Sequence, residues 1–310
     1  MAGRFTILAS GSSGNAALLE ADGFGLLIDC GLHPRTLTAR LREIGAGWDR
    51  INAVILTHTH GDHWKEFTLA DLRSRKIPIY AHVEQFEQLS LVALSYQSLR
   101  QAKLTRTYAD NCLLELVPGL VVRPIRVSHD AEPTFAFRIE CRDSQGVVWS
   151  VGYASDLGCG SAELIEAFAG VDVLALEFNH DVKLERKSRR PKVLVDRVLS
   201  DYGHLSNAQA AELTTAIAAK SGPGYPSHLV QLHLSRECND PELASEAGRE
   251  ALARLRPRAE VITARQNVAT KPISLERKKN SAIGEPGRKT STDCSTSQIR
   301  KQPSLPGFDS

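Results

Sequence analysis

The chain has 310 residues, of which 42% are hydrophobic and 24% are charged, and its formal net charge is +2. The length suits one large α/β domain or two halves of a single fold, with a composition typical of globular proteins. No apolar run reaches the roughly 20 residues that a membrane helix needs. So small a net charge does not by itself predict a nucleic-acid partner, and any electrostatic argument has to be local.

The start of the chain, MAGRFTIL, leads directly into a strand-like run and lacks the pattern of a secretory leader. The six cysteines are scattered, with no Cys-x-x-Cys pair, which favours reduced thiols over a disulfide framework. We therefore expect a cytoplasmic protein.

The first part of the chain alternates short apolar runs with turns. These runs predict strands at Phe5–Ala9, Ala16–Glu20, Gly25–Asp29 and Ala53–Leu56. The glycine-rich GSSGN that follows the first run predicts a hairpin turn. Leu37, Leu41 and Ile44 recur at helical spacing and predict a helix over Arg35–Ile44.

The same alternation returns after a middle region of helices and extended pieces. Strands are predicted at Val121–Val127, Phe135–Cys141, Val147–Tyr153, Val171–Glu177 and Leu229–Leu234. Helices are predicted near Ala162–Phe168, Val193–Asp201 and Ala208–Ala219. Strands followed by helices, twice along the chain, indicate an α/β protein with two sheets.

The pattern stops near residue 270. The segment 271–310 is rich in Ser, Thr, Lys, Arg, Gly and Pro and poor in aromatic residues, so it has too little apolar surface to offset the entropy cost of ordering. We predict a folded domain over residues 1–269 and a disordered tail over residues 270–310.

A concentration of histidine follows the predicted strand 53–56, where residues 58–63 read HTHGDH. Imidazole and carboxylate are ligands that Zn²⁺ and similar divalent ions prefer. His58 and His60 alternate at the end of a strand and can aim at one point, while Asp62 and His63 can reach a second point. This layout fits two ions at roughly 3.5–4 Å from each other.

HTHGDH resembles the His-x-His-x-Asp-His signature of the metallo-β-lactamase superfamily. The resemblance implies a four-layer αβ/βα sandwich of two similar halves, with a two-metal site along one edge. It further implies that His129 in RVSHDA is a ligand of the first ion, that Asp156 in YASDLG bridges both ions, and that His233 in LVQLHL binds the second. By the same resemblance, Asp29 in LLIDCG supports the metal loop without binding metal.

The match is closer to the YycJ/WalJ-like branch of nucleases, through ASGSSGN, LLIDCG, SHDA, LEFNHD and GHLSN. This branch implies a DNA exonuclease that works from 5′ ends. Two divalent ions, Zn²⁺ or Mn²⁺, lower the pKa of a bound water and so provide a hydroxide nucleophile. Asp62 is therefore predicted to be essential for catalysis.

His204 in YGHLSN lies outside the predicted ligand set. Its motif resembles the Gly-His-Ser/Thr element of ribonucleases such as the transfer-RNA 3′-processing endonuclease, where the histidine stabilises charge or protonates the leaving oxygen. The segment also has the pattern of a helix start, with Ser206 or Asn207 as the N-cap. Glu177 could orient His204, or it could be an ordinary carboxylate at a strand end.

Three segments are candidates for substrate contacts. In GSSGN, the backbone around Ser12, Ser13 and Asn15 could face phosphate, although a tight turn explains the motif equally well. A helix N-terminus at Ser206 is a second candidate anion site. A basic segment could follow a nucleic-acid backbone, or be a solvated loop, and its cations are Lys183, Arg186, Lys187, Arg189, Arg190 and Lys192.

The final segment, QPSLPGF, resembles the short peptide by which bacterial replication and repair proteins bind the sliding clamp. Gln302, Leu305 and Phe308 would be its anchors. Clamp binding would favour DNA over RNA as the substrate.

Two other functions remain open. The same fold could serve a small-molecule hydrolase for an ester, thioester or lactone, but GHLSN and the basic segment argue against this. A non-catalytic, clamp-bound adaptor is the other alternative, and the intact set of candidate ligands argues against it.

Overall fold

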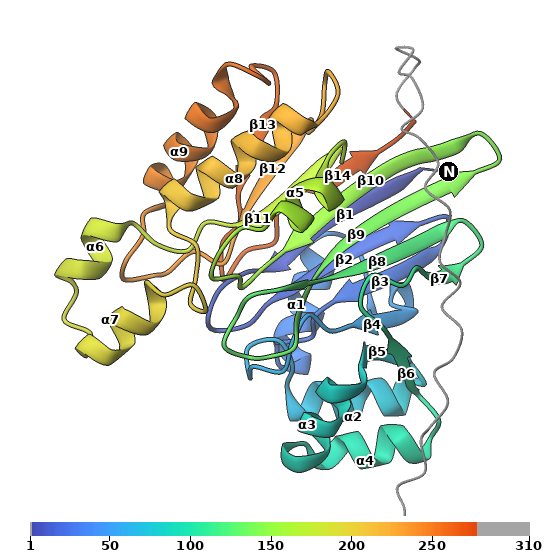
Figure 1. Cartoon of the computed structure of the whole chain (residues 1–310). Coiled ribbons are helices and arrows are strands. Elements are labelled where there is room, and N and C mark those ends of the chain that lie inside the picture. The colour runs from blue at the N-terminus through green and yellow to red at the C-terminus, as the bar shows by residue number, and fades with distance from the viewer. Residues whose placement is uncertain (1, 278–310) are drawn as a thin grey trace, which may run out of the picture.

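Two seven-stranded sheets form the centre of the protein in the computed structural model, which describes residues 2–277 (Figure 1). The first sheet has the strand order β14 (Ile273–Leu275), β1 (Gly3–Ala9), β2 (Ala16–Ala21), β3 (Phe24–Ile28), β4 (Ala53–Ile55), β5 (Ile79–His82) and β6 (Thr105–Tyr108). The second has the order β13 (Glu260–Thr263), β12 (His228–Leu232), β11 (Val173–Glu177), β10 (Gly146–Ala154), β9 (Thr134–Asp143), β8 (Leu120–Val127) and β7 (Leu114–Val117).

The two halves repeat one topology. In the first sheet, β1 to β3 pair antiparallel and β3 to β6 pair parallel. In the second sheet, β7 to β10 pair antiparallel and β10 to β13 pair parallel. The carboxyl ends of the parallel strands in each half are therefore available to build a shared site.

Helices cover the outer face of each sheet (Figure 1). Those packed on the first sheet are α1 (Pro34–Glu43), α2 (Glu66–Arg75), α3 (Val83–Val92) and α4 (Leu94–Gln101), together with the short 3-10 helix η1 (Trp48–Arg50). Those packed on the second are α5 (Ala162–Phe168), α8 (Asn207–Lys220) and α9 (Pro241–Ala253). Two short helices, α6 (Val182–Lys187) and α7 (Lys192–Val198), project from the body.

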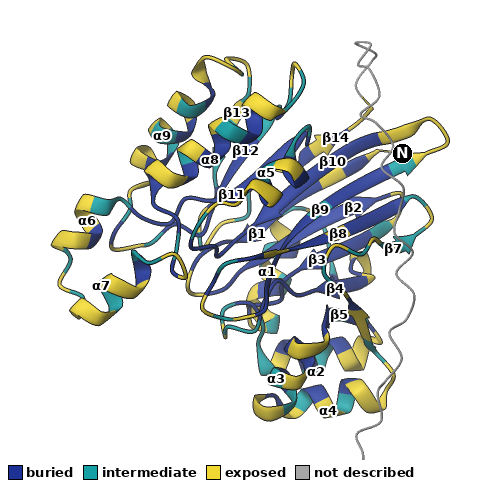
Figure 2. Cartoon of the chain, in the orientation of Figure 1, coloured by how far each residue is buried: buried dark blue, intermediate teal, exposed yellow. Residues whose placement is uncertain are grey.

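Three hydrophobic clusters fill the three interfaces between these layers (Figure 2). Because successive side chains of a strand point to opposite faces, Phe5 and Ile7 of β1 pack between the sheets while Leu8 packs under the helices. Buried strands therefore appear in the sequence as continuous apolar runs. The predicted four-layer αβ/βα sandwich is confirmed.

Two expectations about element boundaries need correction. The folded domain extends past residue 269, because β14 pairs with β1 and buries Ile273 and Leu275. The strand β12 ends at Leu232, so His233 follows the strand instead of lying within it.

Gln302, Leu305 and Phe308 lie outside the described residues, so clamp binding stays a prediction. No helix among residues 2–277 has the length and apolar character that a membrane crossing requires.

Candidate active site

Side chains from both sheets meet along one edge of the sandwich, at the carboxyl ends of the strands. Asp29 follows β3, the HTHGDH loop follows β4, His129 follows β8, Asp156 follows β10 and His233 follows β12. Asp29, Asp156 and His233 have positive φ values of 60°, 59° and 55°. Such a conformation is uncommon outside glycine, and it concentrates at functional sites, where the surrounding structure holds it in place.

One group of possible metal ligands consists of His58, His60 and His129, whose ligand atoms all lie within 4.8 Å of one another. His129 Nδ1 donates a hydrogen bond to the Gly203 carbonyl at 2.9 Å, which leaves Nε2 facing His60 Nδ1 at 3.3 Å. His58 Nε2 is buried and has no hydrogen-bond partner. Burial, reinforced by His63, holds the pKa of His58 well below its ordinary value, so the ring is neutral. A neutral, unpaired imidazole nitrogen suits a metal ligand.

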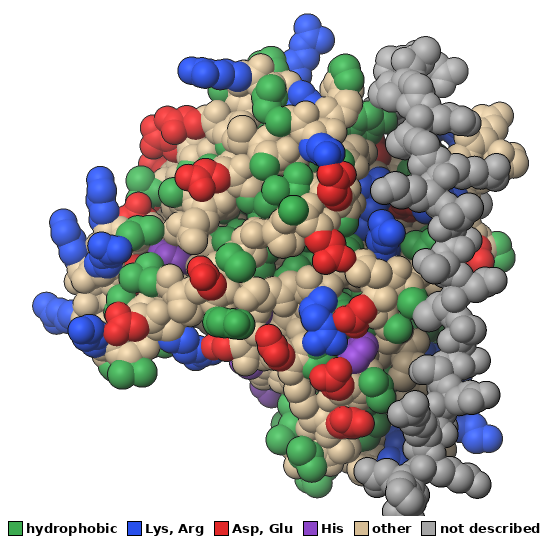
Figure 3. All heavy atoms as spheres, viewed as in Figure 1, with side chains coloured by type: hydrophobic (Ala, Val, Ile, Leu, Met, Phe, Trp, Pro, Cys, Tyr) green, Lys and Arg blue, Asp and Glu red, His purple; other side chains and the backbone are tan. Residues whose placement is uncertain are grey.

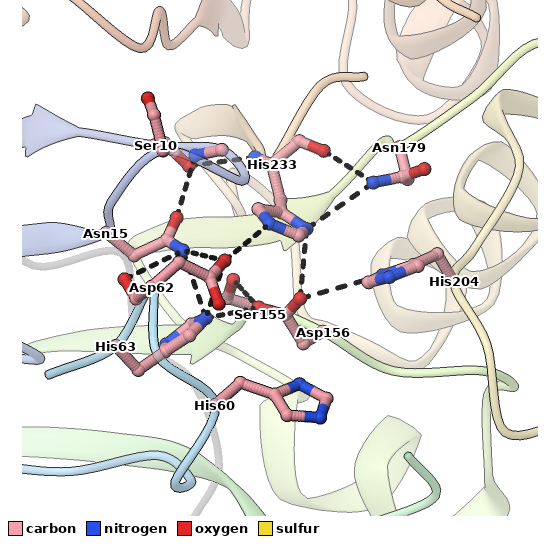
Figure 4. Close-up of polar contacts among 12 residues, drawn as sticks. Ser10, Asn15, His60, Asp62, His63, Ser155, Asp156, Asn179, His204 and His233 are labelled. Carbon is pink, nitrogen blue, oxygen red and sulfur yellow. Dashed lines mark hydrogen bonds and ion pairs between the residues drawn. The ribbon is translucent and has the colours of Figure 1, made fainter. Parts of the chain in front are cut away.

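A second group contains Asp62, His63 and His233 (Figure 4). His63 Nδ1 donates to the buried Asp29 carboxylate at 2.8 Å, which orients the ring and leaves Nε2 facing Asp62 at 3.7 Å. His233 Nε2 lies 3.4 Å from the same Asp62 oxygen. A hydrogen bond from one ring nitrogen to a carboxylate is how ligating histidines are usually held.

Asp156 connects these groups, because its carboxylate oxygen lies within 4.8 Å of ligand atoms of both His58 and His63. Its Oδ2 is 3.0 Å from His63 Nε2, and its Oδ1 is 3.0 Å from His233 Nδ1. Burial alone would raise the pKa of Asp156, but His233 and His63 outweigh it and hold the pKa well below the usual range. The carboxylate is therefore ionised in a buried position, where a charge is retained only with paired partners.

The structure thus brings all seven predicted metal ligands into one cluster. The donors are imidazole nitrogens and carboxylate oxygens, an orphaned nitrogen points into the cluster, and the groups overlap. The residues present therefore fit divalent metal ions. Each of the three groups that include His58 or Asp62 also takes a residue from the second half, whereas a fourth group lies wholly in the second half and consists of Asp156, Glu177, His204 and His233.

His204 lies at the rim of this cluster. Its Nδ1 donates to Glu177 Oε1 at 2.8 Å, and its ring centroid is 5.1 Å from those of both His129 and His233. Burial lowers the pKa of His204, but the adjacent Glu177 carboxylate raises it above its ordinary value. The structure therefore pairs Glu177 with His204, which is the arrangement expected if Glu177 orients the ring.

Glu177 is fully buried yet well supplied with donors. Its Oε2 accepts hydrogen bonds from the backbone N–H groups of Leu157 and Leu205, each at 3.1 Å. Burial would raise the pKa of Glu177, but the attraction of His204 and the hydrogen bonds from the neighbouring histidines lower it to about 2. This carboxylate therefore fixes the loop that carries His204 as well as the ring itself.

Some supporting residues were not predicted. Asp130 Oδ1 lies 3.3 Å from His129 Nε2 and 3.6 Å from His60 Nε2, and Asp130 is also paired with Arg197. Asn179 Nδ2 donates to the His233 carbonyl at 2.8 Å. Both lie in the motifs SHDA and LEFNHD, which could have drawn attention to them. Gly203 begins the quoted motif GHLSN but was assigned no role, and a Cβ there would lie 2.2 Å from the Arg197 carbonyl oxygen.

Of the predicted substrate contacts outside the basic segment, two are exposed and two are buried. Ser12 and Ser13 are exposed, but Asn15 is fully buried, with Nδ2 3.2 Å from Asp62 Oδ2 and 3.0 Å from His63 Nε2. Asn15 thus contacts the metal loop instead of facing solvent. Ser206 is the N-cap of α8, and it is buried with its hydroxyl bonded to Gln209.

The basic segment comprises helix α6, a bend over residues 188–191 that carries Arg189 and Arg190, and the first residue of α7. Lys183, Arg186, Lys187 and Arg189 are exposed, and Figure 3 shows Lys and Arg side chains gathered over α6 and α7. Arg190 differs, because its guanidinium pairs with the buried Glu185 and with Glu237 at 3.2 and 2.9 Å. Arg190 therefore anchors the segment and is not free to contact a substrate.

Comparison with known proteins agrees with this geometry. A family model described as a beta-lactamase superfamily domain matches residues 25–228. The chain belongs to the metallo-β-lactamase superfamily. The predicted membership and hydrolase class are confirmed.

Within the superfamily the chain falls in the WalJ/YycJ-like branch. It is 31% identical to the exodeoxyribonuclease WalJ of Streptococcus pneumoniae over 249 residues, which cover 78% of this chain and 85% of that one. It is 28% identical to the exodeoxyribonuclease YycJ of Bacillus anthracis over 246 residues, or 77% and 85% of the two chains. The fold is shared with Zn²⁺-bound PqqB of Methylobacterium extorquens, with a TM-score of 0.62, 19% identity, and coverage of 87% of this chain and 100% of that one.

Proposed function

We propose that this protein is a two-metal phosphodiesterase that degrades DNA from 5′ ends. The observation that carries the proposal is the Glu177–His204 pair at the rim of the His/Asp cluster, with Nδ1 of His204 held at 2.8 Å. An imidazole fixed in this way has its other nitrogen available for a group beside the metal centre. Hydrolysis of a phosphodiester requires such a group, because the departing oxygen needs charge stabilisation or a proton.

In this proposal His58, His60 and His129 would hold one ion, Asp62, His63 and His233 would hold the other, and Asp156 would be available to both. Bound divalent ions supply a nucleophile at neutral pH, by lowering the pKa of water, and polarise the phosphodiester. The support for two ions is the pair of neighbouring ligand groups and the position of Asp156 between them.

The chain's own residues do the remaining work. His204 Nδ1 donates to Glu177, so Nε2 faces the substrate side and protonates or stabilises the leaving oxygen. The exposed cations of α6 contact the phosphate backbone without reading sequence. The choice of DNA rests on the Streptococcus pneumoniae and Bacillus anthracis relatives, both named exodeoxyribonucleases, of which this chain covers 85%. The choice of 5′ ends rests on the resemblance of the sequence motifs to the WalJ/YycJ-like branch.

The test is to incubate the purified protein, with Mn²⁺ or Zn²⁺, with end-labelled duplex DNA, single-stranded DNA and structured RNA. We expect DNA to be shortened from its 5′ end. Asp62→Ala is the matched control against a contaminating nuclease, and it should lower the rate by roughly 100-fold or more, since even partners that only support a ligand cost 10–100-fold. Circular dichroism should show that the variant remains folded.

The results that would contradict the proposal are clear. Equal cleavage by Asp62→Ala and the wild type would reject the metal mechanism. Cleavage of RNA alone would reject DNA as the substrate. Hydrolysis of lactones or thioesters without any cleavage of nucleic acid would favour a small-molecule hydrolase of the same fold.

A further inference from the structure

A cavity of about 360 Å³ lies beside the candidate metal centre. Leu234 and Ala264 contribute apolar surface to it, and Arg236, Arg265 and Asn267 contribute polar groups. Leu234 directly follows His233 in the chain, so the cavity begins where the metal cluster ends. The metal ligands, the Glu177–His204 pair and the cations of α6 do not line this cavity.

Ser10 connects the cavity to the metal centre. Its hydroxyl accepts a hydrogen bond from the backbone N–H of His233 at 2.8 Å (Figure 4). Its own backbone N–H donates to the Arg265 carbonyl at 3.3 Å. One residue therefore contacts both a candidate ligand and a wall of the cavity, which fixes the distance between the two.

The GSSGN turn holds the polar side chains of the cavity in position. Ser13 Oγ donates to Gln266 Oε1 at 2.7 Å and accepts from Arg236 at 3.1 Å. A Cβ at Gly11, whose φ is +136°, would lie 2.4 Å from Gln266 Nε2, so glycine is needed for this close approach. The turn, the segment after β12 and the segment after β13 are far apart in sequence, and here they form one wall.

The charge of the cavity favours an anion. Arg236 and Arg265 are both exposed, and no acidic side chain is among the described residues that line it. The planar guanidinium group matches the geometry of a phosphate and binds it with paired hydrogen bonds. A volume of about 360 Å³ is at the small end of the range for small-ligand sites, roughly 300–1,000 Å³, and suits one nucleotide and not a duplex.

We propose that this cavity binds the terminal nucleotide of the strand being degraded, with its 5′-phosphate on Arg236 and Arg265 and its sugar and base over Leu234 and Ala264. The inference rests on the proposed nuclease function and adds the feature by which an end is recognised. A terminal nucleotide held there places the next phosphodiester toward the metal centre, because the cavity and His233 are adjacent. The products are then mononucleotides.

The test compares duplexes of one sequence that begin with a 5′-phosphate or a 5′-hydroxyl group and carry a 3′ label. We expect the wild type to favour the phosphorylated end by at least about tenfold in kcat/KM. The double variant Arg236→Gln/Arg265→Gln should reduce this preference to about twofold or less. Arg249→Gln/Arg258→Gln removes two exposed charges from the same half of the protein and should keep the preference.

A binding measurement separates the cavity from catalysis. Calorimetry in EDTA, with deoxythymidine 5′-monophosphate as the probe and thymidine as the comparison, should show binding of the monophosphate that Arg236→Gln/Arg265→Gln weakens by about tenfold. A wild type that cleaves both ends equally, or a double variant that keeps the preference or the affinity, overturns the inference and leaves the nuclease proposal intact. A wild type that cleaves no DNA overturns the nuclease proposal itself.

Discussion

His204 reaches the cluster from the loop before α8, and its only charged hydrogen-bond partner within the described residues is Glu177. This pairing makes the two residues one functional unit. Glu177 is fully buried, so in this proposal it acts through the ring. The effects of removing the two residues should therefore not add.

A double-mutant cycle tests this unit. We expect His204→Ala to lower kcat by roughly 10²–10⁴-fold on DNA, the usual contribution of a proton-transfer group. In the wild-type background, Glu177→Gln should lower kcat with little change in KM. In the His204→Ala background, the same substitution should lower kcat little further. Both substitutions should lower kcat far less on a substrate with a p-nitrophenolate leaving group, because this group needs no proton to depart.

Two results would contradict the pairing. One is reductions in kcat that multiply in the double variant, and the other is equal reductions on DNA and on the p-nitrophenyl substrate.

The sequence was sufficient to find the residues of this site but not its connections. HTHGDH, His129, Asp156 and His233 could be predicted because ligand chemistry restricts the residue types and the motif fixes their spacing. The hydrogen bonds between Asn15 and Asp62, or between His129 and Gly203, join segments 47 and 74 residues apart. No local pattern carries such a contact, since it depends on how distant segments pack within each half.

At the scale of elements, the strands in the centre of the sheets were predicted well because both of their faces are buried. β3 and β11 are continuous apolar runs for this reason. The strands β6 and β13 were not predicted, because they are short edge strands of four residues with exposed or half-buried positions. The pattern of a buried strand is weak there.

The α6–α7 segment gives a prediction at this scale. Replacing Lys183, Arg186 and Lys187 with Gln should weaken the binding of duplex DNA and reduce the slope of log K against log salt by up to about 3, since each phosphate contact contributes about 0.9. Fluorescence anisotropy over a salt series measures the slope. Cleavage of a small phosphodiester should fall much less than cleavage of long DNA.

The matched control for this experiment is Arg249→Gln/Arg254→Gln/Arg258→Gln, three exposed cations in or just after α9. An equal effect of the two triple variants would mean that net charge, and not the α6–α7 segment, governs binding. Arg190 is left out because its pairing with the buried Glu185 makes its replacement a stability change.

At the scale of the whole molecule, β14 closes the first sheet although it lies beyond the compositional end of the domain. Ile273 and Leu275 are 6% and 2% exposed and pack between the sheets. Composition averaged over a window could not detect two buried residues at the border of a polar segment. The position of Ile273 and Leu275 is instead set by the pairing of β14 with residues Gly3 to Phe5 of β1.

A truncation series tests the contribution of this strand. A chain that ends at residue 269 should have a free energy of unfolding lower by roughly 3–6 kcal/mol than a chain that ends at residue 277, because two buried aliphatic side chains contribute about 1.5–3 kcal/mol each. It should also aggregate more readily, since β1 becomes an unpaired edge. Urea denaturation measures the first effect. Equal midpoints for the two chains would show that β14 adds no stability.

The division of the ligand cluster between the two halves has a consequence for synthesis. His58 to His63 leave the ribosome early, whereas His233 is added after about three quarters of the chain. A nascent chain that carries the HTHGDH loop alone has neither Asp156 nor His233 with which to complete the cluster. On the proposed ligand assignment, hydrolytic competence therefore arises only once translation has passed β12, and an incomplete chain released before that point lacks His233.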